Sequence, residues 1–177
     1  MRIFDDIRVK AAWLYEDISI KKIIRVCFTD GTLSMVLYRS MAWANRYALL
    51  KPLAMVLFKL NGLLCGAVIG TGAEFGERFV ILHSCGIVIN SRVKGGNDIM
   101  LESSVVIGEK KRIYPILGNN IYIGSGAKII GDVTIGNNVT IGANAVVVKD
   151  VPSNVTVGGV PAKIICCKTP PKEQFKG

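Results

Sequence analysis

Residues 117–151 read LGNNIY IGSGAK IIGDVT IGNNVT IGANAV VVKDV, and this stretch divides into consecutive groups of six. Each group begins with a large aliphatic residue and carries a second apolar residue four places later. A helix cannot keep one face apolar at this spacing, because six residues are not a whole number of 3.6-residue turns. Short strands joined by tight corners can, with glycine and asparagine where the backbone bends. The repeat therefore predicts an all-β solenoid, a parallel β-helix of stacked coils, rather than an α/β domain with glycine-rich turns.

The same spacing continues toward the N-terminus with two interruptions. Eight residues separate Ile81 from Ile89, so two extra residues lie within LHSCGIV, and ten separate Ile107 from Leu117, so four extra lie within GEKKRIYPI. Because each coil is held by the next, extra residues must loop outward, and such loops are where solenoids tend to place function. The first insertion holds His83, the single histidine of the chain, and the second is basic.

Residues 1–64 do not follow this repeat. The stretches KAAWLYEDISIKKIIRV and TLSMVLYRSMAWANRY carry apolar residues at helical spacings. We expect Asp30 to cap one helix, Pro52 to open another, and Asn61-Gly62 to close it. The sequence therefore predicts an N-terminal helical cap over residues 1–64, a β-helix domain over residues 65–165, and a polar C-terminal tail over residues 166–177.

The composition and charge of the chain limit the kinds of molecule that it is expected to bind. The formal net charge of +9 fits nucleic acid, acidic lipid or a phosphate-bearing cofactor. Nucleic acid is disfavoured because the basic residues are dispersed without interleaved aromatic residues. One histidine and five cysteines without paired spacing predict no metal site, and they predict reduced thiols in a cytoplasmic protein.

The most apolar stretch is ALLKPLAMVLFKLNGLLCGAVIG, which Lys51, Pro52 and Lys59 interrupt. It falls short of the roughly 20 uninterrupted apolar residues that span a bilayer. A helix that lies on a membrane surface stays an open alternative, so peripheral membrane contact is one expectation.

The stretches HSCGIVIN, IGSGAKIIGDVTIGNNVTIGANAVV and VGGVPAKII resemble the serine acetyltransferase family of hexapeptide-repeat acyltransferases. The likeness is greatest to the branch found in bacterial polysaccharide gene clusters, and it covers residues 65–165. The resemblance implies a left-handed parallel β-helix that assembles as a homotrimer. It also implies acetyl-CoA as the acyl donor, bound along the coils beside a neighbouring subunit.

The resemblance also implies roles for particular residues. His83 falls on the catalytic histidine, and Ser125 and Ala143 fall where backbone groups meet the pantetheine arm of CoA. Lys163 falls near the nucleotide end of CoA.

The family's Arg-His-Pro element, which helps hold the amino-acid acceptor, is Ile113-Tyr114-Pro115 in this chain, and Arg112 is a candidate for the missing arginine. Arg112 and Tyr114 are therefore the expected acceptor-binding residues.

Two carboxylates of serine-specific relatives are missing, because Leu82 and Val68 stand in their places. The second of these carboxylates orients the histidine in the family. The candidates for orienting His83 in this chain are Glu74, Glu77, Glu102 or a backbone carbonyl.

Transfer of an acetyl group from a thioester to an alcohol requires a base, and histidine suits this task because its unperturbed pKa is about 6.5. We therefore expect an acetyl-CoA-dependent O-acetyltransferase. A sugar hydroxyl is the expected acceptor, since the charged groups that would bind a free amino acid are replaced at positions 68, 82 and 113. The alternatives are a serine O-acetyltransferase and a non-catalytic assembly or membrane-surface protein that uses Trp13, Trp43 and the apolar helices.

Overall fold

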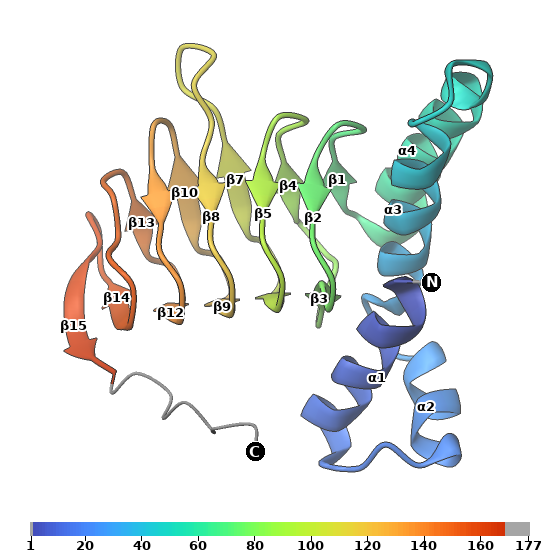
Figure 1. Ribbon diagram of the computed structural model, residues 1–177, viewed down its shortest axis with the longest axis horizontal. Helices are drawn as coiled ribbons and strands as arrows, with labels where there is room; N and C mark the ends of the chain where they lie inside the picture. Colours follow the sequence, from blue (N-terminus) through green and yellow to red (C-terminus); the bar gives the residue numbers. More distant parts are fainter. Residues whose placement is uncertain (1, 169–177) are drawn as a thin grey trace, which may run out of the picture.

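The computed structural model describes residues 2–168, which form a helical region followed by a β-solenoid (Figure 1). The helices are α1 (Arg2–Tyr15), α2 (Ile20–Cys27), α3 (Thr32–Ala44), the 3₁₀ turn η1 (Ala48–Leu50) and α4 (Lys51–Cys65). The strands are β1 (Val68–Ile69), β2 (Glu74–Phe75), β3 (Val80–Ile81), β4 (Val88–Ile89), β5 (Lys94–Gly95), β6 (Ile99–Leu101), β7 (Val106–Gly108), β8 (Ile116–Leu117), β9 (Ile121–Ile123), β10 (Lys128–Ile130), β11 (Thr134–Ile135), β12 (Val139–Ile141), β13 (Val146–Val147), β14 (Val155–Gly158) and β15 (Lys163–Cys167).

Successive strands rotate through three sheets. The first sheet has the order β1-β4-β7-β10-β13, the second β2-β5-β8-β11, and the third β3-β6-β9-β12-β14-β15. Neighbouring strands are parallel except for β14 and β15, which are antiparallel. Each of the first four coils contributes one strand to each sheet, so the predicted β-solenoid with an N-terminal helical region is confirmed.

Strand register shows where the coils differ in length. Val68, Val88, Val106, Lys128 and Val146 pair in succession along the first sheet, so the coils between them hold 20, 18, 22 and 18 residues. A coil of 18 residues is three hexapeptides. The extra residues lie between β3 and β4 and between β7 and β8, so both insertions are confirmed at the expected places.

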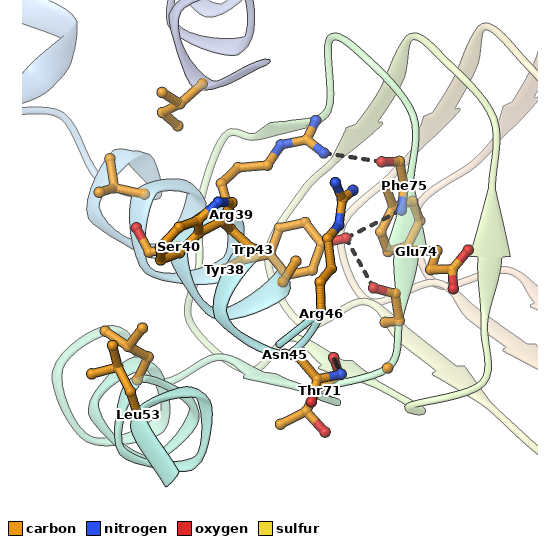
Figure 2. Close-up of a pocket in the computed structure, with 16 residues that line it drawn as sticks. Tyr38, Arg39, Ser40, Trp43, Asn45, Arg46, Leu53, Thr71, Glu74 and Phe75 are labelled. Atoms are coloured by element: carbon orange, nitrogen blue, oxygen red, sulfur yellow. Dashed lines mark hydrogen bonds between the residues drawn. The ribbon is translucent and has the colours of Figure 1, made fainter. Parts of the chain in front are cut away.

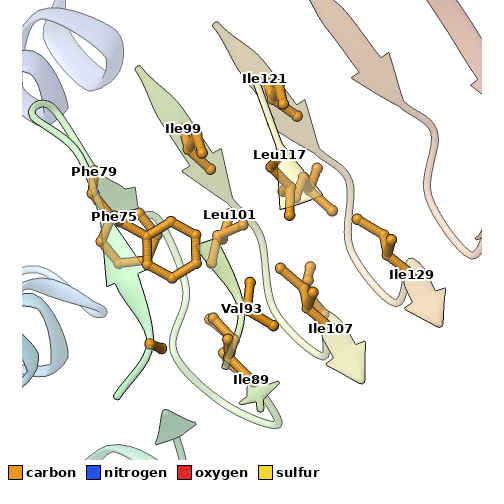
Figure 3. Close-up of a cluster of buried hydrophobic side chains, with 14 of the residues drawn as sticks. Phe75, Phe79, Ile89, Val93, Ile99, Leu101, Ile107, Leu117, Ile121 and Ile129 are labelled. Carbon is orange, nitrogen blue, oxygen red and sulfur yellow. The ribbon is translucent and has the colours of Figure 1, made fainter. Parts of the chain in front are cut away.

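The core of the solenoid is built from the aliphatic residues that begin each hexapeptide (Figure 3). Ile123, Ile135 and Ile141 are at most 1% exposed, as the repeat predicts. In the first coil the rings of Phe75 and Phe79 stack at 4.2 Å between centroids. Phe75 pairs in register with Gly95, where a Cβ atom would lie 2.5 Å from the Phe75 ring. Glycine therefore leaves the space that this aromatic pair fills.

Helix α3 is fastened to the first coil by polar side chains (Figure 2). The Tyr38 hydroxyl donates to the Ala73 carbonyl and accepts from the Phe75 N–H, both at 3.1 Å. Arg39 donates to the Phe75 carbonyl at 2.9 Å and forms a buried ion pair with Asp6 of α1 at 2.7 Å. These contacts hold α1 and α3 against the coil as one unit. Beside them a cavity of about 1040 Å³ opens between α3, α4 and the first coil.

Two helix boundaries differ from the sequence prediction. Asp30 does not cap α3, because Gly31 occupies the N-cap position with φ +78° and no side-chain capping bond forms. Helix α4 does not end at Asn61-Gly62 but continues to Cys65, where Gly66 adopts φ +64°. Asn61 is 1% exposed, so packing of α4 overrides the local turn preference of the Asn-Gly pair.

The C-terminal boundary also differs slightly. Strand β15 runs to Cys167, two residues beyond the expected end of the domain at residue 165. The remainder of the expected tail, residues 169–177, lies outside the described residues.

Candidate active site

His83 lies on the insertion between β3 and β4, at the corner where the chain passes from the third sheet to the first. Its side chain is 61% exposed, yet it has a fixed partner: Nδ1 lies 3.1 Å from Oδ2 of Asp30. Asp30 belongs to the turn that precedes α3, 53 residues earlier in the chain. The site is therefore made where the helical region meets the first coil.

The Asp30 carboxylate is itself held by donors. Its Oδ1 accepts from the backbone N–H of Gly31 at 2.7 Å and from the Ser84 hydroxyl at 3.0 Å. Burial alone raises the pKa of Asp30, but the hydrogen bonds from His83, Ser84 and Gly31 outweigh it and leave the pKa below its usual value. An ionised carboxylate only accepts hydrogen bonds, so in the neutral imidazole the Nδ1 proton points at Asp30 and the Nε2 lone pair is free.

Gly31 allows this contact because its backbone touches the backbone of the bulge. A Cβ atom at this position would lie 2.3 Å from the Ile81 carbonyl oxygen and 2.9 Å from that of Leu82. The positive φ of Gly31 also disfavours any other residue. Any larger residue would push Asp30 away from His83.

Lys10 of α1 lies beneath the same contact and is completely buried. Its Nζ donates to the backbone carbonyl of Asp30, to Thr32 Oγ1 at 3.1 Å and to the Leu82 carbonyl at 3.4 Å. Burial lowers the pKa of Lys10 to about 8, against the opposing effect of the Asp30 charge. One ammonium thus joins α1, the Asp30 turn and the residue next to His83.

Among residues 2–168, none of the carboxylates proposed from the sequence to orient His83 forms a hydrogen bond or ion pair with it. Glu102 accepts a hydrogen bond from the Tyr122 hydroxyl at 3.0 Å, and Glu77 lies 3.5 Å from Arg78. Glu74 lines the cavity beside α3. Asp30 takes this role instead, and sequence reasoning assigned it to helix capping. The available signal was the Asp30-Gly31 pair, a turn dipeptide that does not indicate a partner far along the chain.

The residues expected to bind CoA lie on the same corner of the solenoid as His83, in later coils. Backbone hydrogen bonds stack this corner: Ser104 N–H to Cys85 O, Gly126 N–H to Ser103 O, and Asn144 N–H to Ser125 O. We call residues 82–87, 102–105, 124–127 and 142–145 the corner column. From the coil of His83 to that of Ala143 it extends about 14 Å, given a strand spacing of about 4.8 Å.

Backbone donors are free along this column. Within residues 2–168, the N–H groups of Ser125 and Ala143 have no protein partner, because the corner bonds use the residues that follow them. The Ser125 hydroxyl is 2.8 Å from that of Ser103. Lys163 lies past the end of the column, exposed at the start of β15 and paired with Gly158.

Arg112 and Tyr114 lie on the insertion between β7 and β8, where the chain passes from the first sheet to the second. His83 lies at the corner between the third sheet and the first. The loop between β7 and β8 projects on the side of the coils away from β3 in Figure 1. A single chain therefore does not bring the two expected acceptor-binding residues to His83. Among residues 2–168, no group of three or more His, Cys, Asp or Glu side chains is placed to hold a metal ion.

The fold and the repeat match a known class of protein. Residues 114–149 match the family model described as bacterial transferase hexapeptide (six repeats).

The similar proteins described next all bear the name serine acetyltransferase. A serine acetyltransferase from Synechococcus elongatus is 34% identical over 146 residues, which are 80% of this chain and 59% of the relative. The chain thus spans about three fifths of that relative's length. Serine acetyltransferase from Brucella abortus in complex with coenzyme A superposes with a TM-score of 0.83 at 26% identity, over 95% of this chain and 68% of that one. The enzyme from Neisseria gonorrhoeae in complex with serine gives 0.80 at 28% identity, over 92% and 68%.

These comparisons confirm the resemblance to serine acetyltransferases that HSCGIVIN and the hexapeptides carry. They do not support the narrower expectation of the polysaccharide gene-cluster branch, because all three of these relatives bear the name serine acetyltransferase.

Lys10 gives the fold a pH dependence. Its pKa is lower in the folded chain, about 8 against an ordinary 10.5, so between these values the unfolded chain holds a proton that the folded chain has released. Stability should therefore rise with pH across this window, by about 3 kcal/mol at most. Urea unfolding at pH 7 to 10 should show that Lys10→Met lowers the free energy of unfolding, and that this loss increases with pH. The exposed Lys94→Met is the control and should show no such trend; a pH-independent cost of Lys10→Met would mean that Lys10 does not release its proton on folding.

Proposed function

We propose that this protein is an acetyl-CoA-dependent O-acetyltransferase whose acceptor is the hydroxyl group of serine. The observation that carries the proposal is the hydrogen bond between His83 Nδ1 and Asp30 on an exposed bulge. That bond leaves a free imidazole nitrogen at the head of a corner with free backbone donors. The similarity to serine acetyltransferases supports it, including one solved with coenzyme A and one with serine.

In the proposed reaction, His83 Nε2 takes the proton of the acceptor hydroxyl as its oxygen attacks the thioester carbonyl. The positive charge that forms on the imidazole is stabilised by the Asp30 carboxylate 3.1 Å from Nδ1. When the carbon–sulfur bond breaks, the protonated imidazole returns the proton to the leaving thiolate. The products are an ester and a free thiol, and no covalent bond to the protein forms.

The corner column suits an elongated acyl donor. We propose that the donor lies along it, with the free N–H groups of Ser125 and Ala143 toward its amide-bearing arm and Lys163 near its nucleotide phosphates. Arg112 and Tyr114 would reach this column from a neighbouring copy, in a homotrimer of the kind expected from the resemblance. The proposed setting is the cytoplasm, and the five described cysteines are unpaired.

The proposed acceptor differs from the sequence expectation of a sugar hydroxyl, which rested on missing charges at Val68, Leu82 and Ile113. Asp30 supplies a carboxylate that this reasoning did not include. Its side chain is 52% exposed, and within residues 2–168 His83 is the one side-chain partner of Oδ2. Asp30 thus takes the part of the histidine-orienting carboxylate that the sequence comparison found missing at Val68. The relatives' name favours serine over a sugar.

The first test is the histidine. His83→Ala should lower turnover by about 10²–10⁴-fold, because it removes the base. The melting temperature should change little, since the side chain is on the exposed bulge and outside the aliphatic core. Acetyl-CoA affinity should also be retained. The test is to measure turnover, melting temperature and acetyl-CoA binding on one preparation of the variant, because together they distinguish a catalytic histidine from a structural one. A lower melting temperature with activity retained per folded molecule would instead identify a structural histidine.

The second test is the acceptor. Thiol release from acetyl-CoA should be fastest with L-serine and slower with simple sugars and nucleotide sugars. With serine it should be about 10²–10⁴-fold slower in the His83→Ala variant. Faster release with a sugar would leave the transferase activity standing and overturn serine as the acceptor. Failure to bind or consume acetyl-CoA with any acceptor would favour the non-catalytic scaffold and overturn the whole proposal.

A further inference from the structure

Helix α4 and the turn before it present an apolar surface to solvent. Leu49 is 90% exposed and Leu63 is 80% exposed. The other large apolar side chains exposed on this segment are Leu53, Met55, Val56 and Leu64. The segment Ala48–Cys65 is long and apolar enough to cross a membrane by length and composition, and 11% of it is buried. Soluble monomers rarely expose so much contiguous apolar surface without a partner.

The opposite side of α4 packs against the rest of the protein. Ala54 and Asn61 are buried, and α4 packs along α3. Helix α3 is tied in turn to the first coil by Arg39 and its ion pair with Asp6. A spanning α4 would draw this polar clamp into hydrocarbon, which is costly. The geometry therefore favours a helix that lies on a surface over one that crosses a bilayer.

Basic residues outnumber acidic ones from α2 to the start of the first coil. Between residues 18 and 73 the chain has seven basic residues and one acidic residue, Asp30. Arg39 is paired with Asp6, and the other six have no carboxylate within 4.0 Å among residues 2–168. These six are Lys21, Lys22, Arg25, Arg46, Lys51 and Lys59.

Helix α2 also has exposed apolar side chains together with basic residues. Its Ile20 and Ile24 are exposed, and Phe28 just after it is 88% exposed. Lys21, Lys22 and Arg25 lie between them in the sequence. Both helices belong to the helical end of the molecule, away from the final coils (Figure 1).

We propose that the helical end of this protein docks on an anionic lipid surface, with α4 lying in the plane of the headgroups. The exposed leucines would enter the boundary of the acyl chains, and Lys51 and Lys59 would meet lipid phosphates by extending their aliphatic stems along the helix. Trp43 and Tyr47, whose rings lie 5.5 Å apart at the end of α3, suit the headgroup level.

Charge argues against a twofold contact in which this face pairs with the same face of another copy. An isologous contact would bring the same unpaired cations together, which repel one another. An anionic membrane supplies the opposite charge over a large area, and each lysine or arginine near such a surface strengthens binding.

The test compares two matched double variants in vesicle co-sedimentation. Val56→Ser with Lys59→Glu alters the proposed surface, and Val148→Ser with Lys149→Glu makes the same changes near the opposite end, where Val148 is 48% exposed against 54% for Val56. We expect the parent protein to bind vesicles of equal parts phosphatidylglycerol and phosphatidylcholine, and not vesicles of phosphatidylcholine alone. The first variant should bind about tenfold more weakly, and the control should bind like the parent.

Equal weakening by both variants would mean that net charge alone causes binding, and absence of binding by the parent would mean that lipid is not the partner. Either result overturns the proposal, as does a change in sedimentation coefficient with the first variant, which would mean that another copy covers the face.

Ile24→Ser with Lys21→Glu on α2 provides an independent second variant if the first does not fold. Thiol release from acetyl-CoA in solution should be unchanged in both, so the result is independent of the proposed catalytic function.

Discussion

Parallel stacking of the coils is the constraint on which the rest of this structure depends. Each strand pairs in register with the equivalent strand one coil later, so a coil holds three hexapeptides or places its excess residues outside the stack. The aliphatic residues at the start of each hexapeptide fill the interior, and corner residues line up from coil to coil. The same register that builds the core therefore expels the His83 bulge and aligns the corner column beside it.

A solenoid alone does not complete the site, because His83 needs a partner that its own coils do not provide. The helical region provides it. Tyr38 and Arg39 fix α3 on the first coil, Gly31 allows the turn before α3 to touch the bulge, and Asp30 then meets the imidazole. The helical region is thus part of the proposed catalytic machinery, and the exposed faces of α2 and α4 give it a second role in placing the protein at a lipid surface.

The sequence was sufficient to predict the features that repeat, and it failed at those that do not. The solenoid, the buried aliphatic residues and both insertions followed from a spacing that every coil obeys. Asp30 was missed because its contact with His83 spans 53 residues and depends on how α3 docks, which no periodic pattern encodes. Lys10 was missed for the same reason, since a lysine in an amphipathic helix is normally solvated. The prediction that Asn61-Gly62 ends α4 was wrong, because burial of Asn61 in the helix outweighs the turn preference of this pair.

The most direct test of the proposed site is the tautomer of His83, which is readily assigned because the chain has a single histidine. Long-range proton–nitrogen correlation spectra of isotopically labelled protein distinguish a proton on Nδ1 from one on Nε2. We predict that the neutral ring carries its proton on Nδ1, directed at Asp30, and that the tautomer populations change in Asp30→Ala but not in Glu102→Ala. A neutral ring protonated on Nε2 in the parent protein, or a spectrum indifferent to Asp30→Ala, would contradict the role of Asp30 in orienting the base.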